Sequence, residues 1–284
     1  METMFRVSPK SKIFPIALLL FGIALSCIYW VYETHEKNKF SRKYFEQVAE
    51  NSWDMMGKRL LLQENLSRAV SGLFTTSDAI STIEWDRFLD AMDWEGRYPG
   101  LQEIAFVVPV TEEERERFER RMQFPFSPYF RVETEEKRDD YFVVTFHRAA
   151  NPTQIFYKAG TDLGSEKGRR EAAKQSRDWG RPVFSPLIIR RVDQEVRWDL
   201  IYFYPVYRPD RDITNVKNRR AALFGWIATV YDAKKLFESL YGSVHVDLRA
   251  EVFDGLLISG NSKVYDTHPD MATESSGLEW VRLT

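Results

Sequence analysis

Cysteine is almost absent from this 284-residue sequence, and the one cysteine, Cys27, lies inside an apolar segment. An intrachain disulfide needs two thiols and a cysteine-type zinc site needs several, so neither can form. Histidine is nearly as scarce, and no two of the four histidines have the spacing of a helical metal pair. We therefore expect no metal centre and no cofactor.

The motifs of common enzyme classes are missing as well. The sequence has no glycine-flanked serine nucleophile, no phosphate-binding loop and no dinucleotide fingerprint. The run Thr161-Asp162-Leu163-Gly164 resembles a nucleotide-switch motif, but without a phosphate-binding loop it predicts a turn. Three successive glutamates at 112–114 are typical of a solvated helix start, where the helix dipole stabilises them. We expect no enzymatic activity in this region.

A strong excess of either charge is also lacking, since the formal net charge is -2 at pH 7. Proteins that bind nucleic acids present a basic surface to the phosphate backbone, so we expect no nucleic-acid partner. What is present is apolar material: 44% of the residues are hydrophobic and 14% are aromatic. That composition is sufficient for a folded core and too apolar for a disordered chain.

Charged residues are absent from Ile13 to Tyr32. This run of about 20 residues would span about 30 Å as a helix, the thickness of the hydrocarbon core of a bilayer. Arg6, Lys10 and Lys12 precede it, and the positive-inside rule places residues 1–12 in the cytoplasm. We therefore predict a single transmembrane helix at 13–32 in the inner (cell) membrane, with the rest of the chain periplasmic or extracellular.

Two other interpretations of this segment stay open, a cleaved signal peptide and lipoprotein processing at Cys27. The apolar run continues through 28–31, beyond the place where a signal peptide would be cut. Ala24 stands where lipoprotein sites usually have leucine. The sequence favours a retained anchor.

Residues 33–81 contain no proline, and their apolar residues recur at intervals of three and four. That spacing indicates an amphipathic helix, and a helix of about 45 residues is longer than ordinary globular helices. We predict one continuous stalk helix that pairs with a second copy, which would make the protein a homodimer. The alternative is two helices that break near Gly57 or Gly72, although an isolated glycine costs only about 1 kcal/mol in a helix.

The remaining sequence predicts short helices and strands. Helices are expected at 85–94, 112–122, 165–179 (closed by Gly180) and 233–241. Strands are expected at 101–110, 141–146, 182–189, 198–207, 222–231, 244–253 and 256–259, with a polar loop at 210–220. A long helix followed by a mixed antiparallel sheet with helices corresponds to the α+β class.

Aromatic side chains crowd the predicted strand 198–207. Tyr202 and Tyr204 alternate with Phe203, so the two tyrosines point to one face of the sheet and Phe203 to the other. Trp226 belongs to another predicted strand, 222–231. Such crowding is mostly core packing, but a strand face with a few polar groups can also wall a ligand pocket.

Several motifs in this order resemble those of CHASE domains. They are LSRAVSGLF at 66–74, YPGLQEIAFVVPV at 98–110, GTDLG at 160–164 and YPVY at 204–207. The similarity covers about residues 60–240. Each motif is weak by itself, and their order and spacing make the set fairly specific.

The resemblance implies an extracellular sensory domain of the kind found in receptor histidine kinases and nucleotide cyclases. It implies a stalk helix at 33–81, a membrane-distal PAS-like subdomain at 82–232 that holds the ligand, and a membrane-proximal PAS-like subdomain at 233–284. Such receptors add a second transmembrane helix and a cytoplasmic signalling module, so we expect the chain to be a fragment or a truncated copy with an incomplete second subdomain.

The motifs place the ligand pocket between the strand at 202–207, the strand at 184–187 and the helix start at 165–170. The expected ligand-binding residues are Arg169, Phe184, Ser185, Leu187, Tyr202, Phe203, Tyr204 and Trp226. The best-known relatives bind cytokinins through an aspartate near position 168 or 169 and a threonine at position 203, and neither residue is present here. An arginine in place of the aspartate favours an anionic ligand. The alternative function is a dimerisation or interaction module that binds no ligand.

Overall fold

The structure of this chain, a computed structural model, describes residues 9–76, 80–123, 128–134, 136–192, 195–241, 249, 251–253 and 263–268. Side chains are described for these residues except 9–17, 34–42, 56, 59, 190–192 and 195–196. The chain divides into two compact units, one of residues 1–54 with 279–284 and one of residues 55–278.

Helix α1, Pro9–Thr76, is continuous through both units. It passes without a break through Gly57 and Gly72, where an added methyl group would meet no other atom. The prediction of one long helix rather than two is therefore confirmed, although α1 ends five residues before the expected position 81.

The predicted transmembrane residues 13–32 lie within α1. Among the residues that the structure describes, no helix has both the length and the apolar character needed to cross a membrane.

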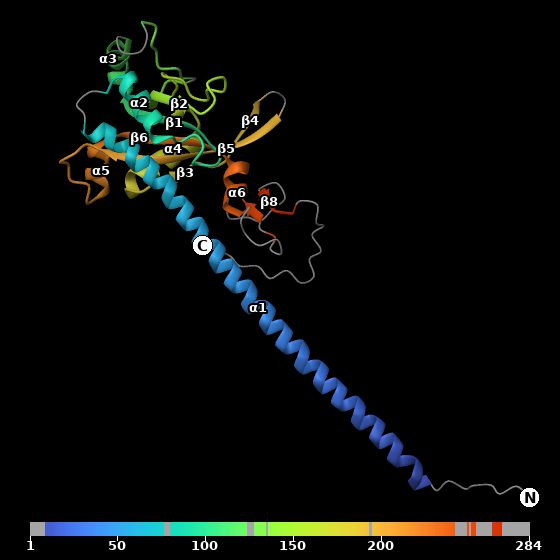
Figure 1. Ribbon diagram of the computed structural model, residues 1–284. Coiled ribbons are helices and arrows are strands. Elements are labelled where there is room, and N and C mark those ends of the chain that lie inside the picture. Colours follow the sequence, from blue (N-terminus) through green and yellow to red (C-terminus); the bar gives the residue numbers. More distant parts are fainter. Residues whose placement is uncertain are drawn as a thin grey trace, which may run out of the picture. The chain divides into compact units, whose positions relative to one another are not determined.

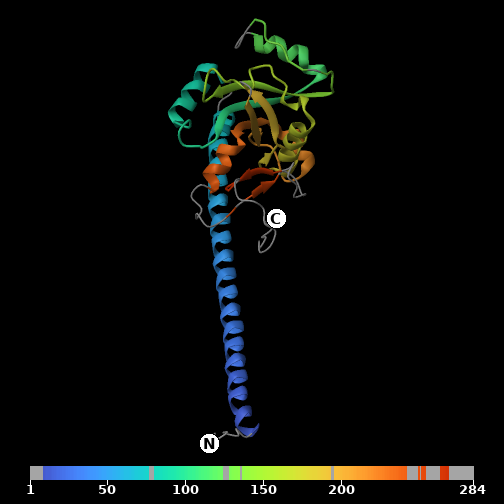
Figure 2. The same ribbon diagram turned by 90° about the vertical axis from the view of Figure 1, so that its right-hand side faces the viewer.

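The second unit contains a six-stranded antiparallel sheet with the order β2-β1-β6-β5-β3, and β4 pairs with β5 beside β3. Figures 1 and 2 show these strands between the helices of the unit. The strands are β1 Leu101–Thr111, β2 Asp140–Ala149, β3 Val183–Phe184, β4 Ile188–Val192, β5 Glu195–Tyr207 and β6 Leu223–Asp232. A long helix followed by an antiparallel sheet with helices confirms the α+β class.

The other helices of the unit lie between the strands in the sequence. They are α2 Thr82–Met92, α3 Glu112–Gln123, the short 3-10 helix η1 Leu163–Ser165, α4 Lys167–Trp179, α5 Val216–Ala222 and α6 Ala233–Tyr241. Gly180 ends α4 in the left-handed conformation, with φ of 68°, as its position predicted. The prediction of a loop at 210–220 is wrong for its second half, because α5 begins at Val216. Asn215 caps the start of this helix through its side chain.

The two faces of the sheet carry separate cores. On one face, Leu66, Val70 and Phe74 of α1 pack with residues of α2 and α6. On the other face, Ala172 and Ala173 of α4 pack against the strands. The sheet is thus held between α1 and α4, and each core excludes water from one face.

The C-terminal part of the described chain forms a small two-stranded sheet of β7, Glu251–Phe253, and β8, Lys263–Asp266. The ring of Tyr241 at the end of α6 stacks on Tyr265 of β8. The expected strand at 244–253 is described only at its end, and the expected strand at 256–259 lies outside the described residues.

Candidate functional site

The aromatic residues predicted to line the pocket divide between the two faces of the sheet. Tyr202 and Tyr204 lie in or against the core on the α1 side, whereas Phe203 and Trp226 belong to the core on the α4 side. The cause is the alternation of side chains along β5, which the sequence already showed. The structure therefore does not bring these four side chains into one pocket.

Of the residues expected in 184–187, Phe184 faces the α1 side. Its ring lies 4.7 Å from that of Tyr202 and 6.4 Å from that of Tyr231, measured between ring centroids. This clustering is typical of aromatic core packing. Leu187 lies just beyond β3 and is half-buried.

Ser185 is buried, and its hydroxyl is fully used within the protein. The Ser185 Oγ accepts a hydrogen bond from the backbone N–H of Ile201 at 3.0 Å and donates one to the carbonyl oxygen of Pro186 at 2.8 Å. The Ser185 N–H donates to the carbonyl oxygen of Ile201 at 2.7 Å. Ser185 thus extends the contact between β3 and β5 and has little capacity left for a ligand.

A pocket of about 280 Å³ lies beside this segment. It is lined by Gly168, Glu171, Ala172, Gln175, Phe184, Ser185 and Pro186. The lining therefore combines one face of α4 with β3 and the residues after it, two of the three elements expected to meet there. Glu171 and Gln175 supply its exposed polar groups.

Arg169 is absent from that lining, because its side chain turns toward the loop before α4. One terminal nitrogen donates to the hydroxyl of Tyr157 at 3.1 Å, and the other donates to the hydroxyl of Ser165 at 3.2 Å. The guanidinium also lies over the Tyr157 ring, and the side chain is only 14% exposed. Its donors are thus largely engaged with the protein, which weakens the case for an anion bound at Arg169.

The position of Tyr157 depends on a carboxylate that the sequence did not single out. Glu103 of β1 is fully buried and accepts hydrogen bonds from the backbone N–H groups of Phe156 at 2.7 Å and Tyr157 at 3.2 Å. Buried carboxylates are stable only when paired or hydrogen-bonded. A glutamate within the largely apolar strand at 101–110 was the available signal for this role.

The motif at 160–164, predicted as a turn, instead runs from bridge residues at 161–162 into the 3-10 helix η1, and it positions the start of α4. The buried carboxylate of Asp162 accepts hydrogen bonds from the N–H groups of Phe142 and Gly164, both at 2.9 Å, and pairs with Arg138. Gly160 has φ of 98°, and a methyl group there would come within 2.4 Å of the carbonyl oxygen of Arg131. These contacts give the motif a structural role.

A polar cluster joins α1 to the sheet on the opposite face. Glu64 and Arg68 form an ion pair of 2.7 Å on α1. Arg68 lies beside the hydroxyl of Tyr204, while burial raises the pKa of Tyr204 above its ordinary value. Tyr204 is therefore neutral and acts in the contact between α1 and β5 rather than in the α4 pocket.

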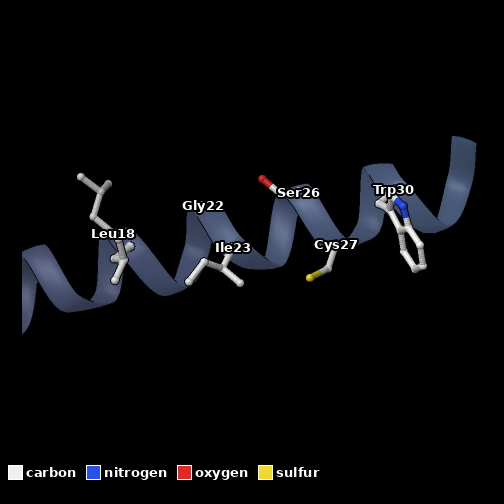
Figure 3. A pocket seen from close by; sticks show the side chains of 7 residues that line it. Leu18, Gly22, Ile23, Ser26, Cys27 and Trp30 are labelled. Carbon is white, nitrogen blue, oxygen red and sulfur yellow. The ribbon is translucent and has the colours of Figure 1, made fainter.

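A second hollow lies in the first unit, on one face of α1. Figure 3 shows its lining side chains along a single stretch of helix, with Gly22 between Leu18 and Ser26. Since one helix supplies all of the lining, no other described residue of this unit encloses a ligand there. Within the described residues, no group of three or more acidic, histidine or cysteine side chains is placed to hold a metal ion.

Comparison with known proteins gives a match to one family model, described as CHASE domain, over residues 78–265. Among solved structures, the crystal structure of the periplasmic sensory domain of the Campylobacter jejuni chemoreceptor Tlp1 is similar with a TM-score of 0.38 and 10% sequence identity. The likeness covers 70% of this chain and 60% of that one, so this chain spans less than two thirds of its length. A likeness this distant carries no information about the ligand.

Proposed function

Because the chain belongs to the CHASE domain family, whose model matches residues 78–265, we propose that it detects a small ligand in the pocket between α4 and β3. CHASE domains are extracytoplasmic sensory modules rather than catalytic ones, and this chain is such a module.

The observation that carries the proposal is the pocket of about 280 Å³ at the start of α4. The resemblance of the sequence motifs predicted a ligand site in the same part of the fold. A small pocket that combines a helix face, an aromatic residue and a few polar groups is a common form of ligand site.

The polar groups of the pocket favour a ligand that donates hydrogen bonds. Glu171 offers a carboxylate, and Gln175 offers an amide. Lys167 is the only partner of Glu171 among the described ion pairs, at 3.8 Å, so the carboxylate keeps most of its capacity to accept. We therefore propose an amine- or amide-bearing ligand in place of the anion that Arg169 suggested.

A thermal-shift screen of residues 34–284 tests the proposal. The compounds should include small organic amines, amides and carboxylates, because a bound ligand raises the melting temperature by mass action. An amine or amide that raises it should do so less in Glu171→Gln and Gln175→Trp, and equally in Glu113→Gln, which alters an exposed glutamate on α3 outside the lining. A carboxylate that retains its effect in Glu171→Gln and Gln175→Trp would contradict both the site and its chemistry.

Dimerisation without a ligand is the second candidate function. It is favoured by Leu61 and Leu62 of α1, which are 56% and 53% exposed in the single chain. Leu66 packs against the sheet and contributes to the fold. Sedimentation that depends on protein concentration, and that Leu61→Gln abolishes, would support a homodimer through the stalk helix.

We also propose that the module is anchored in the inner membrane through residues 13–32 and that the signal passes to a cytoplasmic kinase or cyclase domain. The support for the anchor is the uncharged run in the sequence, and Leu20, Phe21 and Ile28 are more than 60% exposed on α1 in the first unit. Cell fractionation tests this: the full chain should sediment with membranes, and residues 34–284 should not.

A further inference from the structure

Helix α1 presents two buried ridges to the sheet, each with a spacing of four residues. Gln63, Ser67 and Ser71 form a polar ridge. Leu66, Val70 and Phe74 form an apolar ridge beside it. Because residues four apart lie above one another on a helix, each ridge repeats the same kind of side chain with every turn.

Two contacts align these ridges with β6. Tyr231 donates a hydrogen bond to the side-chain oxygen of Gln63, and the ring of Phe74 stacks on that of Phe106, which pairs with Ile227 across β1 and β6. From Gln63 to Phe74, α1 thus runs from the level of Tyr231 toward the level of Ile227. Ser67, one turn after Gln63, comes to the level of Thr229, which lies between Tyr231 and Ile227 on β6.

Ser67 and Thr229 are both fully buried, and neither hydroxyl has a hydrogen-bond partner among the described residues. The Thr229 hydroxyl neighbours that of Tyr231 and partly offsets the rise that burial causes in the pKa of Tyr231, yet the geometry between them is not that of a hydrogen bond. Unpaired buried hydroxyls are rare and costly. The present contact between α1 and the sheet is therefore poorly satisfied at its centre.

The exposed residue Leu62 continues the apolar ridge one turn before Leu66. If α1 moved by one turn toward its C-terminal end, Leu62 would take the place of Leu66 and Gln63 would come to the level of Thr229.

We propose that residues 55–76 of α1 dock on the sheet in a second register, displaced by one helical turn toward the C-terminal end, and that the module switches between these two registers. In the second register the Gln63 amide, which has both donors and an acceptor, satisfies the hydroxyl of Thr229. One-turn movements of packed helices are a known form of switching.

The Phe74–Phe106 stack, with 3.7 Å between ring centroids, holds the present register. The second register loses this stack and gains the burial of Leu62 and the pairing of Thr229. The two states therefore exchange a ring contact for an apolar side chain and a hydrogen bond. A change that strengthens the packing around Phe74 favours the present register. A change that weakens this packing favours the second register.

Thiol labelling tests the two registers without a ligand, so the result does not depend on the proposed α4 pocket. In the full chain with Cys27→Ser, single variants Leu61→Cys and Leu62→Cys should be labelled with a maleimide. The two leucines are almost equally exposed in the present register, at 56% and 53%. We expect Leu62→Cys to be labelled more slowly than Leu61→Cys, by a factor set by the fraction of molecules in the second register, because that register buries it. Equal rates would overturn the proposal.

A second measurement uses cysteine pairs on the same background. Ser67→Cys with Thr229→Cys reports the present register, Gln63→Cys with Thr229→Cys reports the second, and Asn65→Cys with Thr229→Cys is the control on the exposed side of α1. We expect both ridge pairs to form disulfides and the control pair to form none. Failure of the Gln63 pair to exceed the control would overturn the proposal.

Matched substitutions then distinguish a switch between two registers from a general loosening of the contact between α1 and the sheet. Leu62→Asn should reduce the yield of the Gln63 pair by about tenfold, because the second register would bury the amide. Leu61→Asn, at a similarly exposed position off the ridge, should leave it unchanged, and Phe74→Val should increase it. Equal effects of Leu61→Asn and Leu62→Asn would show loosening without a second register and would also overturn the proposal.

Discussion

The phenol of Tyr231 on β6 donates a hydrogen bond to the side-chain oxygen of Gln63 on α1, joining two residues that are 168 positions apart in the sequence. Both side chains are buried. The bond attaches the helix that leads into the second unit directly to the central sheet, and it is the polar contact that aligns the two ridges of α1 with β6.

Replacing Tyr231 by Phe should destabilise the protein by about 1–3 kcal/mol, because the amide oxygen of Gln63 would remain buried without a donor. The free energy of unfolding in urea is the measurement. The double variant Tyr231→Phe with Gln63→Leu should recover part of the loss, since it removes both polar partners. A double variant that loses the sum of the two single effects would contradict this account of the contact.

Glu103→Ala should cost about 2–4 kcal/mol, because it removes the acceptor for two backbone N–H groups of the loop at 156–157. Glu103→Gln keeps an acceptor oxygen and should cost less. Urea denaturation gives both values. If Glu103→Ala were within about 0.5 kcal/mol of the wild type, as an ordinary surface change is, the carboxylate would not be holding this loop.

Gly160→Ala should destabilise the chain by about 2 kcal/mol or more, because φ of 98° is strained for alanine and the new methyl group would meet the carbonyl oxygen of Arg131. The matched control is Gly96→Ala, where a methyl group meets nothing within 4 Å. We expect that control to stay within about 0.5 kcal/mol of the wild type. The melting temperatures of both variants provide the comparison.

Acid should weaken the contact between α4 and α5 through Asp178. Hydrogen bonds from Arg220, at 3.0 and 2.6 Å, and from Arg177, at 2.7 Å, hold the pKa of Asp178 well below its usual value of 3.8. Since the folded pKa is the lower one, this stabilising contribution is present above about pH 4 and is lost as the pH falls toward the folded pKa.

Urea denaturation between about pH 2.5 and 6 measures this effect. The free energy of unfolding of the wild type should fall more steeply below pH 4 than that of Asp178→Asn. Arg220→Gln should flatten the same part of the curve, because Arg220 is the main cause of the lowered pKa. An unchanged slope in Asp178→Asn would rule out this carboxylate as the source of the acid sensitivity.

Local chemistry was sufficient to predict several elements. The absence of proline and the spacing of apolar residues predicted α1 as one helix, because these features act within a few turns. Gly180 predicted the end of α4 for the same reason, since only glycine adopts the left-handed conformation freely. α5 was missed because a helix of seven residues has too few apolar positions to show a period, although its capping residue Asn215 was visible in the sequence.

What the sequence determined by itself is the family, the α+β class, the long helix and the alternation of Tyr202, Phe203 and Tyr204 along one strand, because these depend on residues that are close together in the chain. Only the tertiary structure decided which of the two cores each side chain enters. The extra residue Thr145 in β2 places Val144 and Phe146, two positions apart, in opposite cores. Long-range partners likewise turned Arg169 away from the pocket, toward Tyr157 and Ser165, because a guanidinium is placed by the acceptors that the fold brings near it.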